Sequence, residues 1–259
     1  MLQDSPKTSF FSPQELAAFK RDGFVVVRGL YTPREIGELS ARIDALVKRG
    51  PVAGREMFYF EDSLLEKGKR VLSRVEKFAQ TDDRLCSFVE DERLTGRTTE
   101  LLGDKALLFK EKINFKLPGG GGFAPHQDIQ PGWDDYALYF ISVLVTIDSS
   151  TVANGCLELT SGHHKRGLLG EKWKPLTQEQ LKGVLFEAYP MEPGDAAFFD
   201  CYVPHQSKPN LTDKQRRNLY LTYNRASDGE CREKYFADKR KSYPPDNERE
   251  PGKEYTFKV

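Results

Sequence analysis

The sequence contains few cysteines and lacks a long apolar run. Its four cysteines, Cys86, Cys156, Cys201 and Cys231, are far apart and form no C-x-x-C pair, so neither a zinc ribbon nor a secreted disulfide framework is expected. No stretch approaches the ~20 apolar residues of a membrane span, and no apolar segment of signal-peptide length follows the polar first residues. We therefore expect a cytoplasmic protein with reduced thiols and no membrane partner.

An excess of charge of one sign is also lacking. The 259 residues include 39 lysines and arginines and 39 aspartates and glutamates. This balance gives no uniform basic surface, so nucleic acid is not an expected partner and a small-molecule substrate is. A chain of this length buries roughly 70–75% of the surface of its unfolded form, which predicts a single domain that needs no disulfide or structural metal. Nothing in the sequence indicates an oligomeric state.

The N-terminal part, residues 1–105, is predicted to be a helical support. Ser12–Glu15 and Thr32–Glu35 both have the form of a capping box with proline at the first helical position. The first helix should end near Gly23, and Phe24–Val27 is predicted to be a strand. The second helix carries an apolar stripe that we expect to face the core, formed by Ile36, Leu39, Ile43, Leu46 and Val47.

From residue 106 onward the pattern changes to short strands with period-two alternation. The candidate strands are Leu107–Leu117, Leu138–Ile147, Cys156–Thr160, Val184–Ala188, Ala196–Phe199 and Asn218–Asn224. Such a series predicts a β-sandwich or barrel over about residues 106–227, supported by helices. Gly162–Leu181 is predicted to pass over the mouth of the barrel. The tail, residues 228–259, is charged, and its Lys239–Lys241 run is interpreted as a solvated surface.

Three potential metal ligands stand out because the chain has only four histidines. In His126-Gln127-Asp128 the outer side chains are two residues apart, so on an extended strand they point to the same side. His205 would complete the set from a distant strand. Two imidazoles and one carboxylate leave metal positions open, which is the arrangement of non-haem Fe(II) oxygenases. A lone H-x-D motif also arises by chance, and an alternative interpretation makes Asp128 only a turn residue after Pro125.

An arginine that follows His205 in the sequence could bind a dicarboxylate. Arg216 and Arg217 are both candidates. Strand alternation places Arg216 on the side of Tyr220 and Thr222, and Arg217 on the other side. The residues alone leave the choice between the two arginines open.

Several motifs follow one another in order along the chain. They are Phe19–Val27, Phe115–Gly119 leading to Pro125–Asp128, Asn154–Leu157 followed by Thr160–His164, Pro193–Asp195, and Asn210-x-Thr212-x-x-x-Arg216. Together they resemble the phytanoyl-CoA dioxygenase family of Fe(II)/2-oxoglutarate oxygenases, over nearly the whole chain. The resemblance implies a mainly β fold with flanking α-helices, a double-stranded β-helix or cupin-like jelly roll, with the metal inside one end.

The resemblance also implies a set of site residues. Fe(II) would be held by the catalytic residues His126, Asp128 and His205. The cosubstrate 2-oxoglutarate would pair with Arg216, which the family's spacing favours over Arg217, and O2 would be the oxidant. A guanidinium fork suits a carboxylate better than a lysine does. The further residues implied to contact 2-oxoglutarate are Lys112, Asn114 and Thr212. Alternatively, the lysines from Lys110 to Lys116 form only the solvated face of their predicted strand.

The implied reaction is hydroxylation of an aliphatic carbon, because relatives that halogenate lack the ligating carboxylate that Asp128 provides. Within the family, Lys112–Gly119 and Tyr235–Asp246 look most like the branch that acts on organophosphonates. The expected substrate is 2-aminoethylphosphonate or its N-trimethyl analogue. The residues expected to contact it are Lys110, Trp133, Tyr136, Tyr202 and Arg225. The alternatives are another small zwitterion, an amino acid or a secondary metabolite, a non-catalytic cupin-like binding protein, and a zinc hydrolase.

Overall fold

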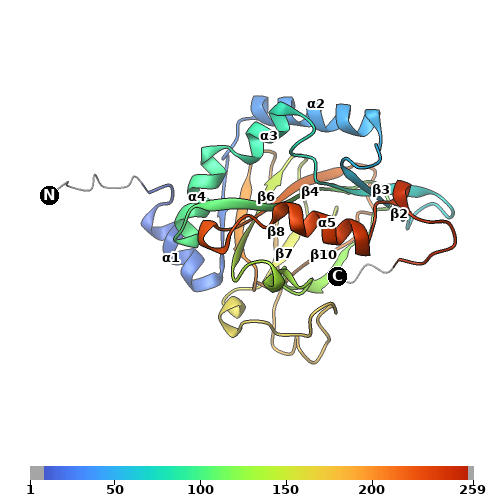
Figure 1. Cartoon of the computed structure of the whole chain (residues 1–259). Coiled ribbons are helices and arrows are strands. Elements are labelled where there is room, and N and C mark those ends of the chain that lie inside the picture. The colour runs from blue at the N-terminus through green and yellow to red at the C-terminus, as the bar shows by residue number, and fades with distance from the viewer. Residues whose placement is uncertain (1–8, 256–259) are drawn as a thin grey trace.

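Two antiparallel β-sheets form the centre of the molecule, and helices flank them (Figure 1). The computed structural model describes residues 9–255. The larger sheet has seven strands in the order β1-β9-β6-β11-β4-β3-β2, and the smaller has four in the order β5-β10-β7-β8. This is the predicted mainly β architecture with flanking helices. Within residues 9–255, no helix has both the length and the apolar character needed to cross a membrane.

The elements have the following bounds. The larger sheet contains β1 (Phe24–Val27), β2 (Met57–Asp62), β3 (Arg70–Glu76), β4 (Ala106–Lys116), β6 (Phe140–Thr146), β9 (Ala196–Asp200) and β11 (Arg216–Arg225). The smaller sheet contains β5 (Phe123–His126), β7 (Leu157–Leu159), β8 (Glu187–Tyr189) and β10 (His205–Ser207). The α-helices are α1 (Pro13–Asp22), α2 (Pro33–Arg49), α3 (Asp83–Val89), α4 (Glu92–Leu102) and α5 (Arg232–Ser242).

The two N-terminal helices begin where the capping motifs predict. The Ser12 hydroxyl accepts from the backbone N–H of Glu15, and the Glu15 carboxylate accepts from the backbone N–H of Ser12. Thr32 and Glu35 make the same reciprocal bonds at the start of α2. These bonds satisfy backbone donors that have no partner within the helix. Gly23 ends α1 in the left-handed conformation, with φ 90°, which glycine adopts without strain.

Alternation along the strands of the larger sheet separates an apolar face from a polar one. Ile113 on β4, Val143 on β6 and Leu219 on β11 are fully buried in one core. The apolar stripe of α2 belongs to the same core, as predicted, and α3 and α4 also contribute to it. The opposite face of these strands carries charged and polar side chains. Because the apolar face is packed against the helices, a ligand-binding site can form only on this polar face of the strands.

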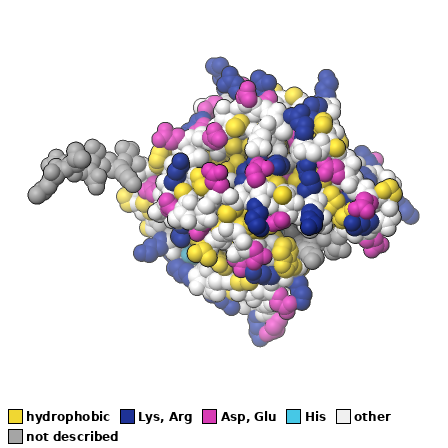
Figure 2. All heavy atoms as spheres, in the orientation of Figure 1, with side chains coloured by type: hydrophobic (Ala, Val, Ile, Leu, Met, Phe, Trp, Pro, Cys, Tyr) yellow, Lys and Arg dark blue, Asp and Glu magenta, His cyan; other side chains and the backbone are white. Residues whose placement is uncertain are grey.

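The outer surface mixes charges of both signs. On the face drawn in Figure 2, lysine and arginine side chains alternate with aspartate and glutamate side chains and with small apolar areas. Neither sign gathers into one broad area on this face. This agrees with the balanced charge of the sequence.

The N-terminal part contains more sheet than the predicted helical support with one strand. A hairpin of β2 and β3 extends the larger sheet beyond β4. On β3, every residue from Val71 to Glu76 is buried, whether apolar or polar. A strand buried on both faces shows no clear alternation between exposed polar and buried apolar residues. The period-two signal used to predict strands is therefore weak in this hairpin.

The C-terminal region also differs from the prediction. Residues Arg232–Ser242 form α5, whose Tyr235 and Phe236 pack in a core with aromatic residues of β2 and β4. Lys239 was predicted to lie on a solvated surface, but its side chain is only 10% exposed, and its ammonium group donates to the carboxylate of Glu76 at 2.6 and 2.8 Å. The amphipathic pattern of α5 is weak, because its buried face combines two aromatic residues with a lysine. The prediction from the charge run was wrong for Lys239.

Ile43 tests the core beneath α2, because its side chain is fully buried. We expect Ile43→Ala to lower the free energy of unfolding by about 2–5 kcal/mol, through lost burial and a residual cavity. Leu185, which is 79% exposed, provides the control, and Leu185→Ala should change the same free energy by less than about 0.5 kcal/mol. Urea unfolding of both variants measures this difference. Equal effects would contradict the assigned core.

Candidate metal centre and substrate cavity

The three predicted metal ligands lie together between two neighbouring strands. His126 ends β5, Asp128 follows it, and His205 begins β10 directly opposite His126. The two imidazole centroids are 4.2 Å apart, and Nε2 of His205 lies 3.8 Å from Oδ1 of Asp128. One potential ligand atom from each residue lies within 4.8 Å of the others. The structure therefore brings together the residues that the sequence singles out.

Hydrogen bonds orient the three side chains toward a common point. Nδ1 of His126 lies 2.7 Å from the carbonyl oxygen two residues earlier in the chain, and Nδ1 of His205 lies 3.0 Å from the carbonyl oxygen at the same spacing. When Nδ1–H donates to these carbonyls, the lone pair of each Nε2 remains free for a metal. The Ser142 hydroxyl donates to Oδ2 of Asp128 and leaves Oδ1 free. This donor set fits a divalent iron ion with open coordination positions.

The electrostatic environment favours the protonation states that metal binding requires. Burial, reinforced by the neighbouring imidazole, lowers the pKa of His126 to about 3. Burial also lowers the pKa of His205. For Asp128, burial opposes ionisation, but the fields of His205, Lys112 and His126 outweigh it and lower its pKa. Two neutral imidazoles and one carboxylate are therefore present near neutral pH, ready to bind a cation.

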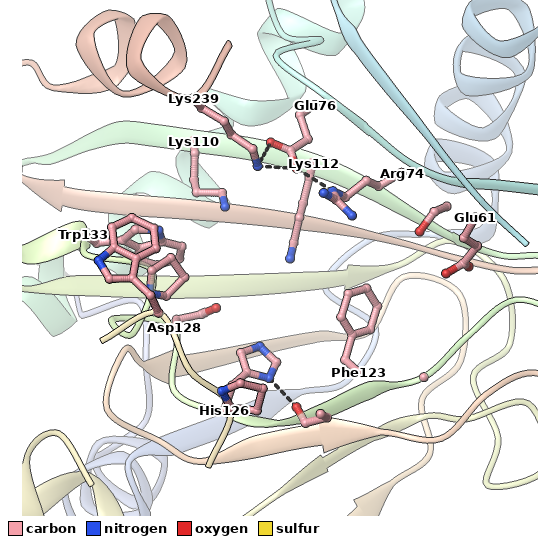
Figure 3. Close-up of a pocket in the computed structure, with 16 residues that line it drawn as sticks. Glu61, Arg74, Glu76, Lys110, Lys112, Phe123, His126, Asp128, Trp133 and Lys239 are labelled. Carbon is pink, nitrogen blue, oxygen red and sulfur yellow. Dashed lines mark hydrogen bonds and ion pairs between the residues drawn. The ribbon is translucent and has the colours of Figure 1, made fainter. Parts of the chain in front are cut away.

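A cavity of about 360 Å³ opens onto this triad (Figure 3). Its volume lies in the range of small-molecule binding sites. His126 and Asp128 lie on one side of the cavity. The opposite side is formed by the inward faces of β3 and β4 and by α5. Cationic side chains from all three of these elements line it, namely Arg74, Lys110, Lys112 and Lys239.

Lys110 is buried in this wall and Lys112 is half-buried, and neither has a carboxylate in ion-pair contact. Neither ammonium group makes a hydrogen bond or an ion pair with any side chain or backbone group in residues 9–255. They instead lie over aromatic rings, Lys110 4.7 Å from the centroid of Trp133 and Lys112 4.9 Å from that of Tyr220. Burial lowers the pKa of Lys110, and burial together with Lys110 lowers that of Lys112 to about 8. An anion bound in the cavity would favour the charged form of both lysines and so raise their pKa values again.

The other two cations share one carboxylate. Glu76 accepts from Nε of Arg74 at 2.8 Å and from Nζ of Lys239. Burial opposes the ionisation of Glu76, but Lys239, Lys110 and Arg74 together lower its pKa below the usual range. Sequence reasoning missed Arg74, Glu76 and Lys239, because they come from the unpredicted hairpin and from the tail. The position of Glu76 opposite Lys112 becomes visible only once β3 is paired with β4.

Arg216 and Arg217 occupy opposite faces of β11. Arg216 is buried on the polar face, where Nη2 donates to the carbonyl oxygen of Gly155 at 2.6 Å and Nε has no hydrogen-bond acceptor among residues 9–255. No carboxylate in this part of the chain forms an ion pair with it. Arg217 is already neutralised by Asp148 and Asp44, each at 2.7 Å. Arg216 is therefore the arginine that retains capacity for a carboxylate ligand.

The comparisons with known proteins agree with this geometry. The family model described as "Phytanoyl-CoA dioxygenase (PhyH)" matches residues 19–218. The chain belongs to the phytanoyl-CoA dioxygenase family. As predicted, it is an Fe(II)/2-oxoglutarate-dependent dioxygenase, rather than a binding protein without activity or a zinc hydrolase.

Relatives of this dioxygenase include two proteins named for phosphonates. It is 38% identical to a 2-aminoethylphosphonate dioxygenase of uncultured bacterium HF130_AEPn_1, over 96% of this chain and 95% of the relative. It is 47% identical to a methylphosphonate hydroxylase of Gimesia maris, over 55% of each chain. Among solved structures, EctD from S. alaskensis superposes with a TM-score of 0.71 at 22% identity, covering 87% of this chain and 80% of EctD. That likeness confirms the predicted jelly-roll fold.

Some of the other predicted contacts of this dioxygenase line the cavity, and others lie outside it. Trp133, Lys110 and Lys112 line the cavity. Asn114 is buried on the same face of β4, and its Oδ1 has no hydrogen-bond donor among residues 9–255. Thr212 lies in the loop before β11, where its hydroxyl donates to the side-chain oxygen of the loop asparagine two residues earlier at 2.7 Å. Thr212 therefore supports the loop and does not line the cavity.

Three residues predicted to contact substrate lie outside the cavity. The Tyr136 hydroxyl donates to Asp238 on α5 at 2.9 Å. Nε of Arg225 donates to the carbonyl oxygen of Leu102 at 3.0 Å, at the far end of β11. Tyr202 is half-buried beside the strand end and is not among the cavity residues. Their aromatic or cationic character suggested a role, but hydrogen bonds of the Tyr136 and Arg225 side chains hold these two residues elsewhere.

Part of the segment of residues 162–181, which was predicted to pass over the mouth of the barrel, borders the cavity. The Gln127 side chain, between the first two ligands of the triad, donates to the carbonyl oxygen of Gly167 at 2.8 Å and accepts from the backbone N–H of Leu169 at 2.7 Å. Trp173 and Pro175 of this segment line the cavity. This segment is thus attached directly to the metal-binding motif.

The buried histidines predict a pH-dependent stability. An unfolded histidine titrates near pKa 6.5, whereas burial lowers the pKa of His205 in the folded protein. Below about pH 6.5 the unfolded chain binds more protons, so the free energy of unfolding falls as the pH falls. His205→Gln, which cannot be protonated, should reduce this fall in the metal-free protein. Urea unfolding with a chelator at about pH 7.5 and about pH 5.5 measures it; equal falls in both proteins would contradict the assignment.

Proposed function

We propose that this dioxygenase hydroxylates an aliphatic carbon of a small organophosphonate such as 2-aminoethylphosphonate. The observation that carries the proposal is the pair of ammonium groups of Lys110 and Lys112, which line the cavity without a carboxylate of residues 9–255 in ion-pair contact. A phosphonate dianion offers three acceptor oxygens to such donors. The names of the two phosphonate relatives support the same substrate class.

The proposal assigns iron to His126, Asp128 and His205, and the distal carboxylate of 2-oxoglutarate to Arg216. Bound iron would activate O2, one oxygen atom of which would enter succinate as 2-oxoglutarate loses CO2, while the other would enter the new hydroxyl group of the substrate. The protein supplies position and charge. Arg216 offers a planar fork to the carboxylate and remains held by the carbonyl of Gly155.

Lys112 has a position suited to orienting the substrate. It extends from β4 toward the side of the cavity that holds His126 and Asp128 (Figure 3). A phosphonate bound by Lys110 and Lys112 would therefore present its adjoining carbon to the metal-binding side. Trp173 and Pro175, which line the cavity, would limit access of water to that carbon. The N-trimethyl analogue is a bulkier alternative that the same anion site would accept.

The proposed substrate is tested by succinate formation in the presence of Fe(II), 2-oxoglutarate and O2. We expect 2-aminoethylphosphonate to stimulate it strongly, and Lys112→Met to lower kcat/KM for the phosphonate by about 10- to 100-fold, the effect of losing a charged hydrogen bond. Lys20→Met, on the exposed face of α1, is the matched control and should have no effect. Succinate formation that neither 2-aminoethylphosphonate, its N-trimethyl analogue nor methylphosphonate changes would refute the substrate class.

The proposed cosubstrate contact is tested by exchanging each arginine for lysine. Arg216→Lys should raise the KM for 2-oxoglutarate by about 10-fold or more, because a point charge replaces the fork. Arg217→Lys should reduce the free energy of unfolding, since its ion pairs connect β11 to α2, and leave that KM little changed. A similar rise in KM for both variants, or a rise for Arg217→Lys alone, would count against Arg216.

A further inference from the structure

Among the described residues, the carboxylates that line the cavity are those of Glu61, Glu76 and Asp128, and two of them are already engaged. Asp128 belongs to the metal-binding triad and accepts from a serine hydroxyl. Glu76 accepts from Arg74 and Lys239. Glu61, on β2, forms no ion pair within 4 Å with a cation of residues 9–255, so its charge remains available to a ligand.

A backbone hydrogen bond fixes the Glu61 carboxylate. Oε1 accepts from the backbone N–H of Gly121 at 3.1 Å. Although burial lowers the pKa of Lys116, the charge of Glu61 acts to raise it. The ammonium group of Lys116, however, donates to Ser207 Oγ at 2.7 Å and to backbone carbonyls. Lys116 is therefore directed elsewhere. Glu61 is half-buried, and a ligand can reach it from the cavity.

The glycine run beside Glu61 permits this arrangement. A Cβ at Gly121 would lie 3.0 Å from Oε2 of Glu61, and a Cβ at Gly122 would lie 2.5 Å from the carbonyl oxygen of Ser207. Side chains at these positions would crowd the carboxylate or displace the backbone that holds it. Gly121 and Gly122 thus allow the backbone to approach the carboxylate and β10 closely.

The two lysines and the available carboxylate of Glu61 line different parts of the cavity. Lys110 and Lys112 come from β4, whereas Glu61 comes from β2, two strands away in the sheet order. Two strand spacings amount to about 10 Å. In Figure 3, Glu61 and Phe123 lie on the side of the cavity away from Lys110 and Trp133, with Lys112 between them. A zwitterion with an anionic and a cationic end matches this separation of charge.

We propose that Glu61 binds the ammonium group of the substrate and so selects aminophosphonates over phosphonates without an amine. This inference rests on the proposed function. The ammonium group would donate to the free oxygen of Glu61, beside the face of Phe123, while the phosphonate is bound by Lys110 and Lys112. Glu61 is then a specificity-determining residue in a reaction whose metal-binding residues lie elsewhere.

The test compares 2-aminoethylphosphonate with n-propylphosphonate, in which a methyl group replaces the ammonium group. The measured quantity is the ratio of their kcat/KM values, from phosphonate-dependent succinate formation. The wild-type protein should favour the amine by about 10-fold or more, and Glu61→Gln should reduce this ratio by about 10- to 100-fold, mainly through KM. Glu61→Asp should retain part of the preference. Glu66→Gln, an exposed carboxylate in the same hairpin, is the matched control and should leave the ratio unchanged.

The outcomes separate this inference from the proposed function. Equal activity of the wild-type protein on both phosphonates would overturn the role of Glu61 and leave the phosphonate proposal standing. A Glu61→Gln variant that loses activity equally on both compounds would show a structural role and would also overturn it. A wild-type protein that acts on neither phosphonate would overturn the role of Glu61, and it would overturn the proposed function as well if the N-trimethyl analogue and methylphosphonate were also without effect.

Discussion

The alternation of side chains along β4 and β11 is the constraint on which the site depends. One face of these strands is mostly apolar and packs under α2, α3 and α4. The other face then has to hold Lys110, Lys112 and Arg216 in the interior, where charged groups are poorly solvated. Their removal from water is tolerated because aromatic faces near the lysines and a backbone carbonyl at Arg216 take the place of water. The same packing that stabilises the sheet therefore prepares a cationic cavity.

The metal-binding triad uses a different device, local backbone geometry. Each histidine is oriented by the carbonyl oxygen two residues before it, so its direction depends on the course of its own strand. The pairing of β5 with β10 then sets the distance between the imidazoles. Few distant contacts are needed, which is why a short sequence motif identifies these residues so well.

The sequence predicts the parts that rest on such local signals. The capping boxes predict α1 and α2, and the ordered motifs predict the jelly roll and the three residues that the structure brings together. The hairpin of β2 and β3 and the helix α5 were missed, because their buried faces are mixed in polarity. The cavity does not contain Tyr136, Tyr202 and Arg225, since residue type alone does not reveal which tertiary partner holds a side chain. The cluster around Glu76 becomes visible only when distant segments are brought together.

The shared carboxylate of Glu76 has a consequence for how the protein can change over evolution. Its partners come from β3 and from α5, segments on either side of the chain region that carries the triad. Much of the cavity wall opposite the triad is therefore encoded apart from the metal-binding motif. Inherited changes in the hairpin or the last helix can reshape this wall while the oxidative chemistry is retained, so a single catalytic framework can serve a succession of different substrates.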